Sequence, residues 1–134
     1  MSTTPQVPPP CDLTLGMACT DKSEPGVTVW TMTADERFTN PVGVVQGGFL
    51  AAMCDSAMGA SSITWAVGQG RRLKRTANAE MKVSFLKAVR PGDQLICTAR
   101  VISGGQRVAF VEAEIQSGDE PVARASSTYL LSDA

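Results

Sequence analysis

The sequence predicts an α+β fold in which one antiparallel sheet wraps around one long buried helix. Three observations lead to this prediction. Residues 47–67 carry an apolar helical pattern, an alternating strand-like segment precedes them, and four strand-like segments follow them. A helix that is apolar on nearly all sides has to be covered by other elements, and a single sheet can cover it.

The chain has 134 residues, which suits one domain with a single core. We expect residues 27–134 to form that domain and residues 1–26 to form an N-terminal arm with a short helical turn at 13–17. Residues 1–10 are polar and proline-rich, and they lack the basic and apolar regions of a signal peptide. None of the four cysteines belongs to a C-x-x-C pair. We therefore expect a cytoplasmic protein.

The predicted helix begins at Gly47 and ends near Val67. Its apolar residues recur at helical spacing, and the opposite face is also poor in charge: Phe49, Leu50, Met53, Ala57, Ala60 and Ile63. Asp55 and several serines and glycines interrupt the apolar run, so a buried helix fits better than a membrane span.

Residues from Val27 onward alternate as in a strand, and further strands are expected at 76–88, 95–102, 108–115 and 122–131. In the first of these four, the alternation puts Ala77 and Ala79 on the apolar side and Asn78 on the polar side. Glycine-containing turns at 103–105 and 117–119 indicate antiparallel neighbours.

Composition excludes several classes of function. Charged residues make up 19% and the formal net charge is -1, so there is no basic excess to hold a nucleic acid. The chain contains no histidine. Catalysis by Ser-His or Cys-His pairs and the usual His-containing zinc sites are therefore excluded. Acid–base chemistry is left to a carboxylate, Lys, Tyr or Cys, and we expect no metal and no cofactor.

Asp55 is the main candidate for that chemistry. It lies in the middle of an apolar helix, and no Lys or Arg stands three or four positions away. Burying an unpaired carboxylate is unfavourable, so a chain keeps one for function or pairs it with a distant partner. Small neighbours such as Gly59 leave room for a ligand beside it. The expectation is a buried catalytic carboxylate.

Gly47 and Gly48 open the helix. The N–H groups at a helix start are free and lie at the positive end of its dipole, and glycine lets a substrate carbonyl approach them closely. This arrangement suits an oxyanion-binding site. It is equally consistent with tight packing of the helix start against the sheet.

Gly47 and Asp55 are eight residues apart, about 12 Å along a helix axis at roughly 1.5 Å per residue. One substrate carbonyl carbon cannot lie about 3 Å from both groups on the same helix. If both act on one carbonyl, they come from different subunits, and two sites at a two-fold interface follow.

Other polar residues are weaker candidates. The amide of Asn78 could orient a water or Asp55, or it could be an exposed strand residue. A basic segment after the helix could hold phosphates, or it could be a solvated loop: Arg71, Arg72, Lys74 and Arg75. Cys54 and the single tyrosine, Tyr129, have no activating partner in the sequence and are interpreted as structural.

The run Asn40 … Gly43 … Gln46-Gly47-Gly48 … Asp55 … Gly59 resembles the PaaI-like branch of the hotdog-fold thioesterases, whose pattern is N-x-x-G-x-x-H-G-G followed by an Asp. The element order of residues 27–131 is similar to that fold. The segment from Phe85 to Asp93 resembles the stretch that follows the first strand after the helix in that family.

The resemblance implies a homodimer or a dimer of dimers that hydrolyses acyl-CoA or aryl-CoA thioesters. Asp55 matches the catalytic carboxylate, and Gly47 matches the backbone donor to the thioester carbonyl. Asn40 matches a residue that positions water or substrate, and Asn78 falls where relatives place Ser or Thr. Gln46 departs from the pattern, because many members carry His there; an amide can donate a hydrogen bond but cannot act as an acid.

Three functions remain open from the sequence. The first is a thioesterase, with Asp55 as nucleophile or as general base. The second is a non-catalytic acyl-CoA-binding module, and the third is a hotdog hydratase, which would normally use His. Four helix residues could line an acyl tunnel or could be plain core: Phe49, Met53, Met58 and Trp65. The acyl group itself is not specified by the sequence.

Overall fold

The computed structural model describes residues 7–134, and it contains one six-stranded antiparallel sheet with a long helix packed against it. The elements in chain order are α1 (Pro10–Leu15), β1 (Ala18–Asp21), β2 (Val27–Thr33), the 3-10 helix η1 (Glu36–Phe38), α2 (Gly47–Gly68), β3 (Leu73–Phe85), β4 (Gln94–Gly104), β5 (Val108–Ser117) and β6 (Glu120–Asp133). The strand order is β1-β2-β4-β5-β6-β3.

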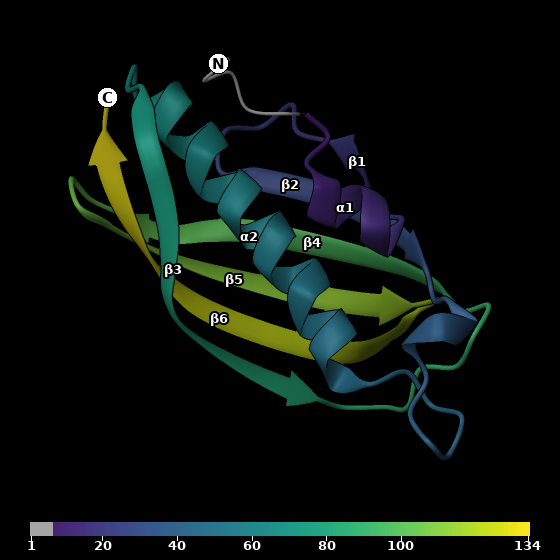
Figure 1. Ribbon diagram of the computed structural model, residues 1–134. Coiled ribbons are helices and arrows are strands. Elements are labelled where there is room, and N and C mark those ends of the chain that lie inside the picture. Colours follow the sequence, from purple (N-terminus) through teal and green to yellow (C-terminus); the bar gives the residue numbers. More distant parts are fainter. Residues whose placement is uncertain (1–6) are drawn as a thin grey trace.

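Figure 1 shows α2 crossing one face of the curved sheet, with β1 and β2 to one side of it and β3 to the other. The core lies between the helix and the sheet. Its largest fully buried side chains come from both layers: Met32, Met53, Met58, Leu95, Ile115 and Val111. No helix within residues 7–134 is long and apolar enough to cross a membrane.

A buried polar network fixes α2 on the sheet. Trp30 Nε1 donates to Thr28 Oγ1 at 2.9 Å, and Thr28 Oγ1 lies 2.8 Å from Ser61 Oγ of α2. Ser61 Oγ in turn donates to the Ala99 carbonyl of β4 at 3.0 Å. Because each buried hydroxyl has partners, the network sets the position of the helix along the sheet without leaving unpaired polar groups.

The helix and the five expected strands are confirmed, with bounds that differ by a few residues. One strand escaped the sequence analysis: β1 is short and exposed along its whole length, so it carries no alternating pattern. It pairs antiparallel with β2, which places part of the expected N-terminal arm in the sheet. Most of the arm's proline-rich beginning lies outside the described residues.

The predicted faces of the strand after the helix are wrong near Asn78. The pairing of β3 with β6 shifts register between Asn78 and Glu80, which marks a β-bulge. A bulge turns the side chains on either side of it, so Ala77 and Ala79 are exposed while Asn78 faces α2. The alternation rule assumes an unbroken period of two, and the bulge breaks that period.

The prediction that α2 is buried on nearly all sides is also wrong for the single chain. The sheet covers one side of the helix, where Leu50, Met53 and Ala57 are buried. Gly48, Asp55, Ile63 and Val67 are exposed on the helix surface. The helix is apolar on a side that this chain alone does not cover.

Candidate active site

Asp55 is exposed in the single chain, contrary to the expectation of a buried carboxylate. One of its oxygens is nevertheless firmly held. Tyr129 OH donates to Asp55 Oδ1 at 2.6 Å, and Asn78 Nδ2 donates to the same oxygen at 3.0 Å. The partners come from β6 and β3, so the carboxylate is held by strands that are distant from it in the sequence.

The side chain of Asn78 has a clear orientation. A carboxylate only accepts hydrogen bonds, so the amide must turn its nitrogen toward Asp55. Nδ2 is also 3.2 Å from Ser127 Oγ and 3.3 Å from Tyr129 OH. Asn78 Oδ1 is buried and has no hydrogen-bond partner in the described chain.

Tyr129 is not the isolated structural residue that the sequence suggested. Its hydroxyl contacts both Asp55 Oδ1 and the Asp55 carbonyl oxygen, the latter at 2.9 Å. Burial, together with the hydrogen bond to Asp55, raises the pKa of Tyr129 well above its ordinary value of 10.0. The phenol therefore keeps its proton and acts as a donor at ordinary pH. This contact was not predictable from local sequence patterns, because 74 residues separate the two groups.

The buried thiols have no place at this site. Cys54 and Cys97 are completely buried in the core. The neighbouring Cys54 side chain and burial both raise the pKa of Cys97, so its thiol stays protonated and is a poor nucleophile. The complete burial of Cys54 fits the structural role that the sequence indicated.

The start of α2 forms a second group of candidate residues. The N–H groups of Gly47 and Gly48 have no hydrogen-bond partner within residues 7–134, as expected for the first turn of a helix. A Cβ on Gly47 would lie 2.7 Å from Cζ of Phe85, whereas one on Gly48 would meet nothing within 4 Å. Gly47 thus packs under the ring of Phe85, whereas Gly48 has open space beside it. The first turn of α2 therefore combines one packed glycine with one exposed glycine.

Asn40 and Gln46 lie beside these glycines. Asn40 Oδ1 accepts from the backbone N–H groups of Val42 and Val44 at 3.0 and 3.1 Å, which shapes the loop before the helix. Its Nδ2 makes no hydrogen bond within residues 7–134. Gln46 is the exposed N-cap residue, and its side chain makes no capping bond. Both amides are free to donate to a ligand.

The structure therefore brings the predicted site residues together in two separate groups. Asp55, Asn78 and Tyr129 form one, and the start of α2 with Asn40 and Gln46 forms the other. Both Gly47 and Asp55 belong to α2, so the expected spacing of about 12 Å along the axis applies. Gly59 lies one turn after Asp55, under the ring of Tyr129.

The basic segment lies at the far end of α2, about 20 Å along the axis from Asp55. Arg71 is engaged within the fold: its guanidinium donates to Asp133 at 3.0 Å and to the carbonyls of Gly105 and Gln106 at 3.0 and 2.7 Å. It is therefore not free to hold a phosphate. Arg72, Lys74 and Arg75 are exposed and form no ion pair within residues 7–134.

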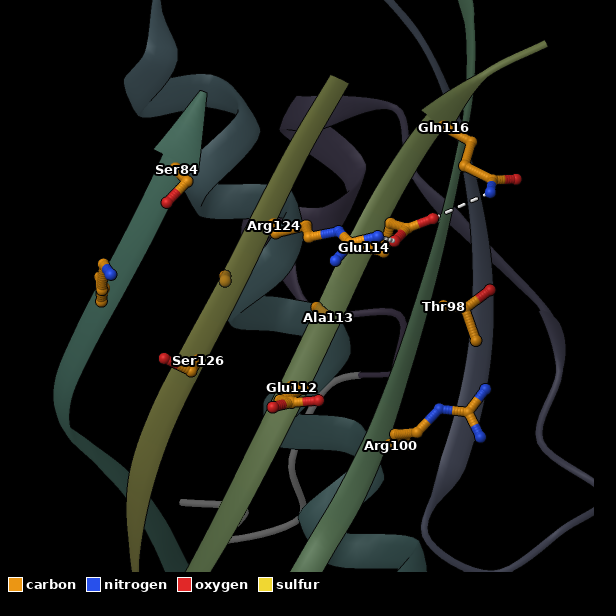
Figure 2. Close-up of a pocket in the computed structure, with 11 residues that line it drawn as sticks. Ser84, Thr98, Arg100, Glu112, Ala113, Glu114, Gln116, Arg124 and Ser126 are labelled. Atoms are coloured by element: carbon orange, nitrogen blue, oxygen red, sulfur yellow. Dashed lines mark hydrogen bonds and ion pairs between the residues drawn. The ribbon is translucent and has the colours of Figure 1, made fainter. Parts of the chain in front are cut away.

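An open polar pocket of about 540 Å³ lies on the opposite face of the sheet from α2, and it holds none of these residues (Figure 2). Two of its charged side chains, Arg124 and Glu114, form an ion pair at 2.9 Å. No cluster of three or more potential metal-ligating side chains exists in the described part of the chain.

Comparison with known proteins decides the family. The sequence model of the thioesterase superfamily matches residues 42–123, which include the start of α2, Asp55 and Asn78. The chain belongs to the thioesterase superfamily. It is therefore a thioester hydrolase with the hotdog fold that the sequence predicted: six antiparallel strands with a long helix packed against them.

Relatives of this superfamily member include a Pseudomonas aeruginosa protein named as an esterase, 31% identical over 77% of this chain and 74% of that protein. Human acyl-coenzyme A thioesterase 13 is 24% identical over 75% of this chain and 69% of its own length.

Solved structures share the fold. The PaaI protein of the Escherichia coli phenylacetic acid degradation operon has a TM-score of 0.81 and 24% identity, covering 90% of this chain and 83% of its own. A thioesterase from Streptococcus pneumoniae, solved with coenzyme A, has a TM-score of 0.78 and 20% identity, covering 87% and 86%.

Proposed function

We propose that this thioesterase superfamily member hydrolyses acyl-CoA or aryl-CoA thioesters, with Asp55 as the catalytic carboxylate. The observation that carries the proposal is Asp55 itself: it is a carboxylate exposed on an otherwise apolar helix side and oriented by two neutral donors. The names of the human and Streptococcus pneumoniae relatives support a CoA thioester as the substrate class.

Hydrolysis requires water to add to the thioester carbonyl carbon and the carbon–sulfur bond to break, with a proton passing to the CoA sulfur. Asp55 serves this reaction either as the base that takes the proton from water or as the nucleophile that attacks first. Both routes need an ionised carboxylate oxygen. Asn78 would orient the carboxylate through the hydrogen bond that its Nδ2 donates to Asp55 Oδ1.

The N–H group of Gly47 would stabilise the negative charge that develops on the thioester oxygen. Since Gly47 and Asp55 are too far apart on one helix to act on one carbonyl, we propose that each active site combines Asp55 of one subunit with Gly47 of a second. The free amides of Asn40 and Gln46 and the open Gly48 would then border the reacting group, and the uncovered side of α2 would lie in the subunit interface.

For the CoA phosphates we propose the exposed basic residues Arg72, Lys74 and Arg75. Arg71 is left out of this set, because its guanidinium is already bonded within the fold. Gly59 would border the acyl group beside Asp55. Residues 27–134 would form the catalytic domain, with residues 1–26 as an arm that contributes the edge strand β1.

The test is release of free CoA thiol from a panel of short, medium, long and aryl-CoA esters, with the wild type beside Asp55→Asn. Asparagine keeps the size of the side chain and removes its charge. We expect turnover in the wild type, a loss of at least about a hundred-fold in the variant, and a preferred ester that names the acyl class. Equal turnover in both proteins would remove Asp55 from the mechanism, and binding of esters without thiol release would indicate a non-catalytic module.

A further inference from the structure

The two oxygens of the Asp55 carboxylate differ in their surroundings. Tyr129 OH and Asn78 Nδ2 both donate to Oδ1, at 2.6 and 3.0 Å. Within residues 7–134, no side chain or backbone group donates to Oδ2. A carboxylate held by one oxygen has a fixed direction for the other, so the unbonded oxygen is the one that can meet a substrate or water.

The position of Tyr129 explains how its hydroxyl reaches Asp55. Tyr129 lies on β6, where it pairs with Asn78 of β3 and Ala109 of β5. Its side chain is only 2% exposed and faces α2. A Cβ on Gly59 would lie 3.6 Å from Cε1 of the ring, so the ring packs directly on the backbone of the turn after Asp55. This contact brings the hydroxyl to the carboxylate.

The bulge in β3 completes the arrangement. The register shift between Asn78 and Glu80 turns Asn78 toward α2, beside Tyr129. Without this shift, the alternation of the strand would point one of the two donors away from Asp55. Bulges often re-aim a side chain next to an active site, and this bulge adds a second donor to the same carboxylate oxygen.

The hydroxyl of Tyr129 can donate a hydrogen bond to the Asp55 carboxylate without transferring its proton. Burial and the neighbouring carboxylate keep the phenol protonated at ordinary pH, so it donates and does not act as an acid. The other donor to Asp55, Asn78, is neutral, and its Nδ2 also contacts the neutral side chains of Met81 and Ser127. Asp55 forms no salt bridge within residues 7–134, so two neutral donors fix its direction without a paired cation.

We infer that Tyr129 is a positioning residue: its hydroxyl holds Asp55 by Oδ1 and leaves Oδ2 as the oxygen that acts in thioester hydrolysis. This inference rests on the proposed role of Asp55. It adds a residue outside the motif of residues 40–59, supplied by the last strand of the fold, and it assigns the reactive atom.

The kinetic test compares Tyr129→Phe with Thr128→Val. Phenylalanine keeps the ring on Gly59 and removes the hydroxyl. Thr128 is the adjacent residue, and its hydroxyl also donates to a carboxylate, Glu80 at 3.1 Å, but away from Asp55. We expect Tyr129→Phe to lower kcat about ten- to a hundred-fold with little change in KM, the scale of one charge-assisted hydrogen bond. Thr128→Val should retain the wild-type kcat. A wild-type kcat in a folded Tyr129→Phe protein would overturn the inference.

A second measurement does not depend on activity. Tyr129 is the only tyrosine in the chain, so the tyrosine doublet in the Raman spectrum reports on its hydroxyl alone. We expect the wild type to show a strong hydrogen-bond donor and Asp55→Ala to show a weaker one. Identical spectra would contradict the contact. If the wild type released no CoA but the spectra differed, the proposed function would fail and the contact between Tyr129 and Asp55 would stand.

Discussion

At the scale of single residues, Asp55 depends on partners that the local sequence does not contain. Its position in an apolar helix without a nearby cation marked it as a candidate from the sequence alone. In the structure Asp55 remains a candidate, but its surroundings differ from those expected. The carboxylate is exposed in the single chain and accepts hydrogen bonds from Tyr129 and Asn78. Sequence spacing can show that no cation lies within a helical turn, but it cannot show which side chains arrive from other strands.

Tyr129 also leads to a prediction about stability at high pH. Its pKa in the folded protein is raised above the unfolded value of about 10. Below pH 10 both states keep the phenol proton. As the pH rises above 10 the unfolded state loses the proton first, so the free energy of unfolding falls, by up to about 1.4 kcal/mol per pH unit.

Urea unfolding of wild type and Tyr129→Phe between pH 9 and 11 measures this effect, because the other titrating groups are shared. We expect the wild type to lose more stability than the variant over this range. If the free energy of unfolding changed with pH equally in both proteins, Tyr129 would have the same pKa in the folded and unfolded states.

A second prediction at this scale concerns the two glycines that open α2. Gly47→Ala puts a Cβ against the Phe85 ring, which is 54% exposed and can turn away, whereas Gly48→Ala meets open space. We expect Gly48→Ala to stabilise the protein by a few tenths of a kcal/mol to about 1 kcal/mol, through the unfolded chain, and Gly47→Ala to lack this gain.

Phe85→Ala supplies the control for this pair, since it removes the obstructing ring. In that background, the two alanine substitutions should have similar effects on the free energy of urea unfolding. If Gly47→Ala and Gly48→Ala change the free energy of unfolding equally in the presence of Phe85, then Phe85 does not restrict the side chain at position 47.

At the scale of secondary-structure elements, regular patterns were predictable and irregular ones were not. The start of α2 at Gly47 and its end one residue after Val67 follow from apolar spacing and glycine-rich ends. β1 has four exposed residues and no alternating pattern, so it was not predictable from the sequence. The bulge in β3 is a local slip in pairing with β6, and such a slip depends on the partner strand rather than on the strand's own residues.

The junction between α2 and β3 allows a prediction that separates structure from substrate binding. Arg71 ties this junction to Asp133 and to the turn between β4 and β5, while Arg72 is exposed. Arg71→Ala should lower the free energy of unfolding by about 1–3 kcal/mol, because carbonyls and a carboxylate lose their donor.

Arg72→Ala should leave the free energy of unfolding within about 0.5 kcal/mol of the wild type and raise KM for CoA esters. Thermal unfolding and steady-state kinetics of both variants check this contrast. A raised KM with unchanged stability in Arg71→Ala would show that Arg71 binds substrate after all.

At the scale of the whole molecule, the sheet order is the feature that the sequence could not provide. β3 follows α2 in the chain but pairs with the last strand, β6, and so occupies the edge opposite β1. This crossover pairs Asn78 with Tyr129, and both side chains reach Asp55 of α2. It also leaves one side of the helix uncovered, including Asp55 and several apolar residues. A second subunit on that side would bury this surface and could complete the active site.

Complementation between two inactive variants tests whether two subunits share each active site. One partner is Asp55→Ala. The other is Gly47→Pro, which removes the N–H group proposed as the oxyanion donor. Proline is favoured at the first position of a helix, and the preceding N-cap residue already has the extended conformation that proline requires. Subunit exchange in an equal mixture makes half of the dimers mixed, and each mixed dimer has one intact site.

We expect thiol release to rise from near zero in each parent to about a quarter of the wild-type rate in the exchanged mixture. Mass spectrometry of the intact assemblies confirms that exchange has occurred. A mixture with verified mixed dimers that stays as inactive as its parents would contradict an active site built from Asp55 of one subunit and Gly47 of the other.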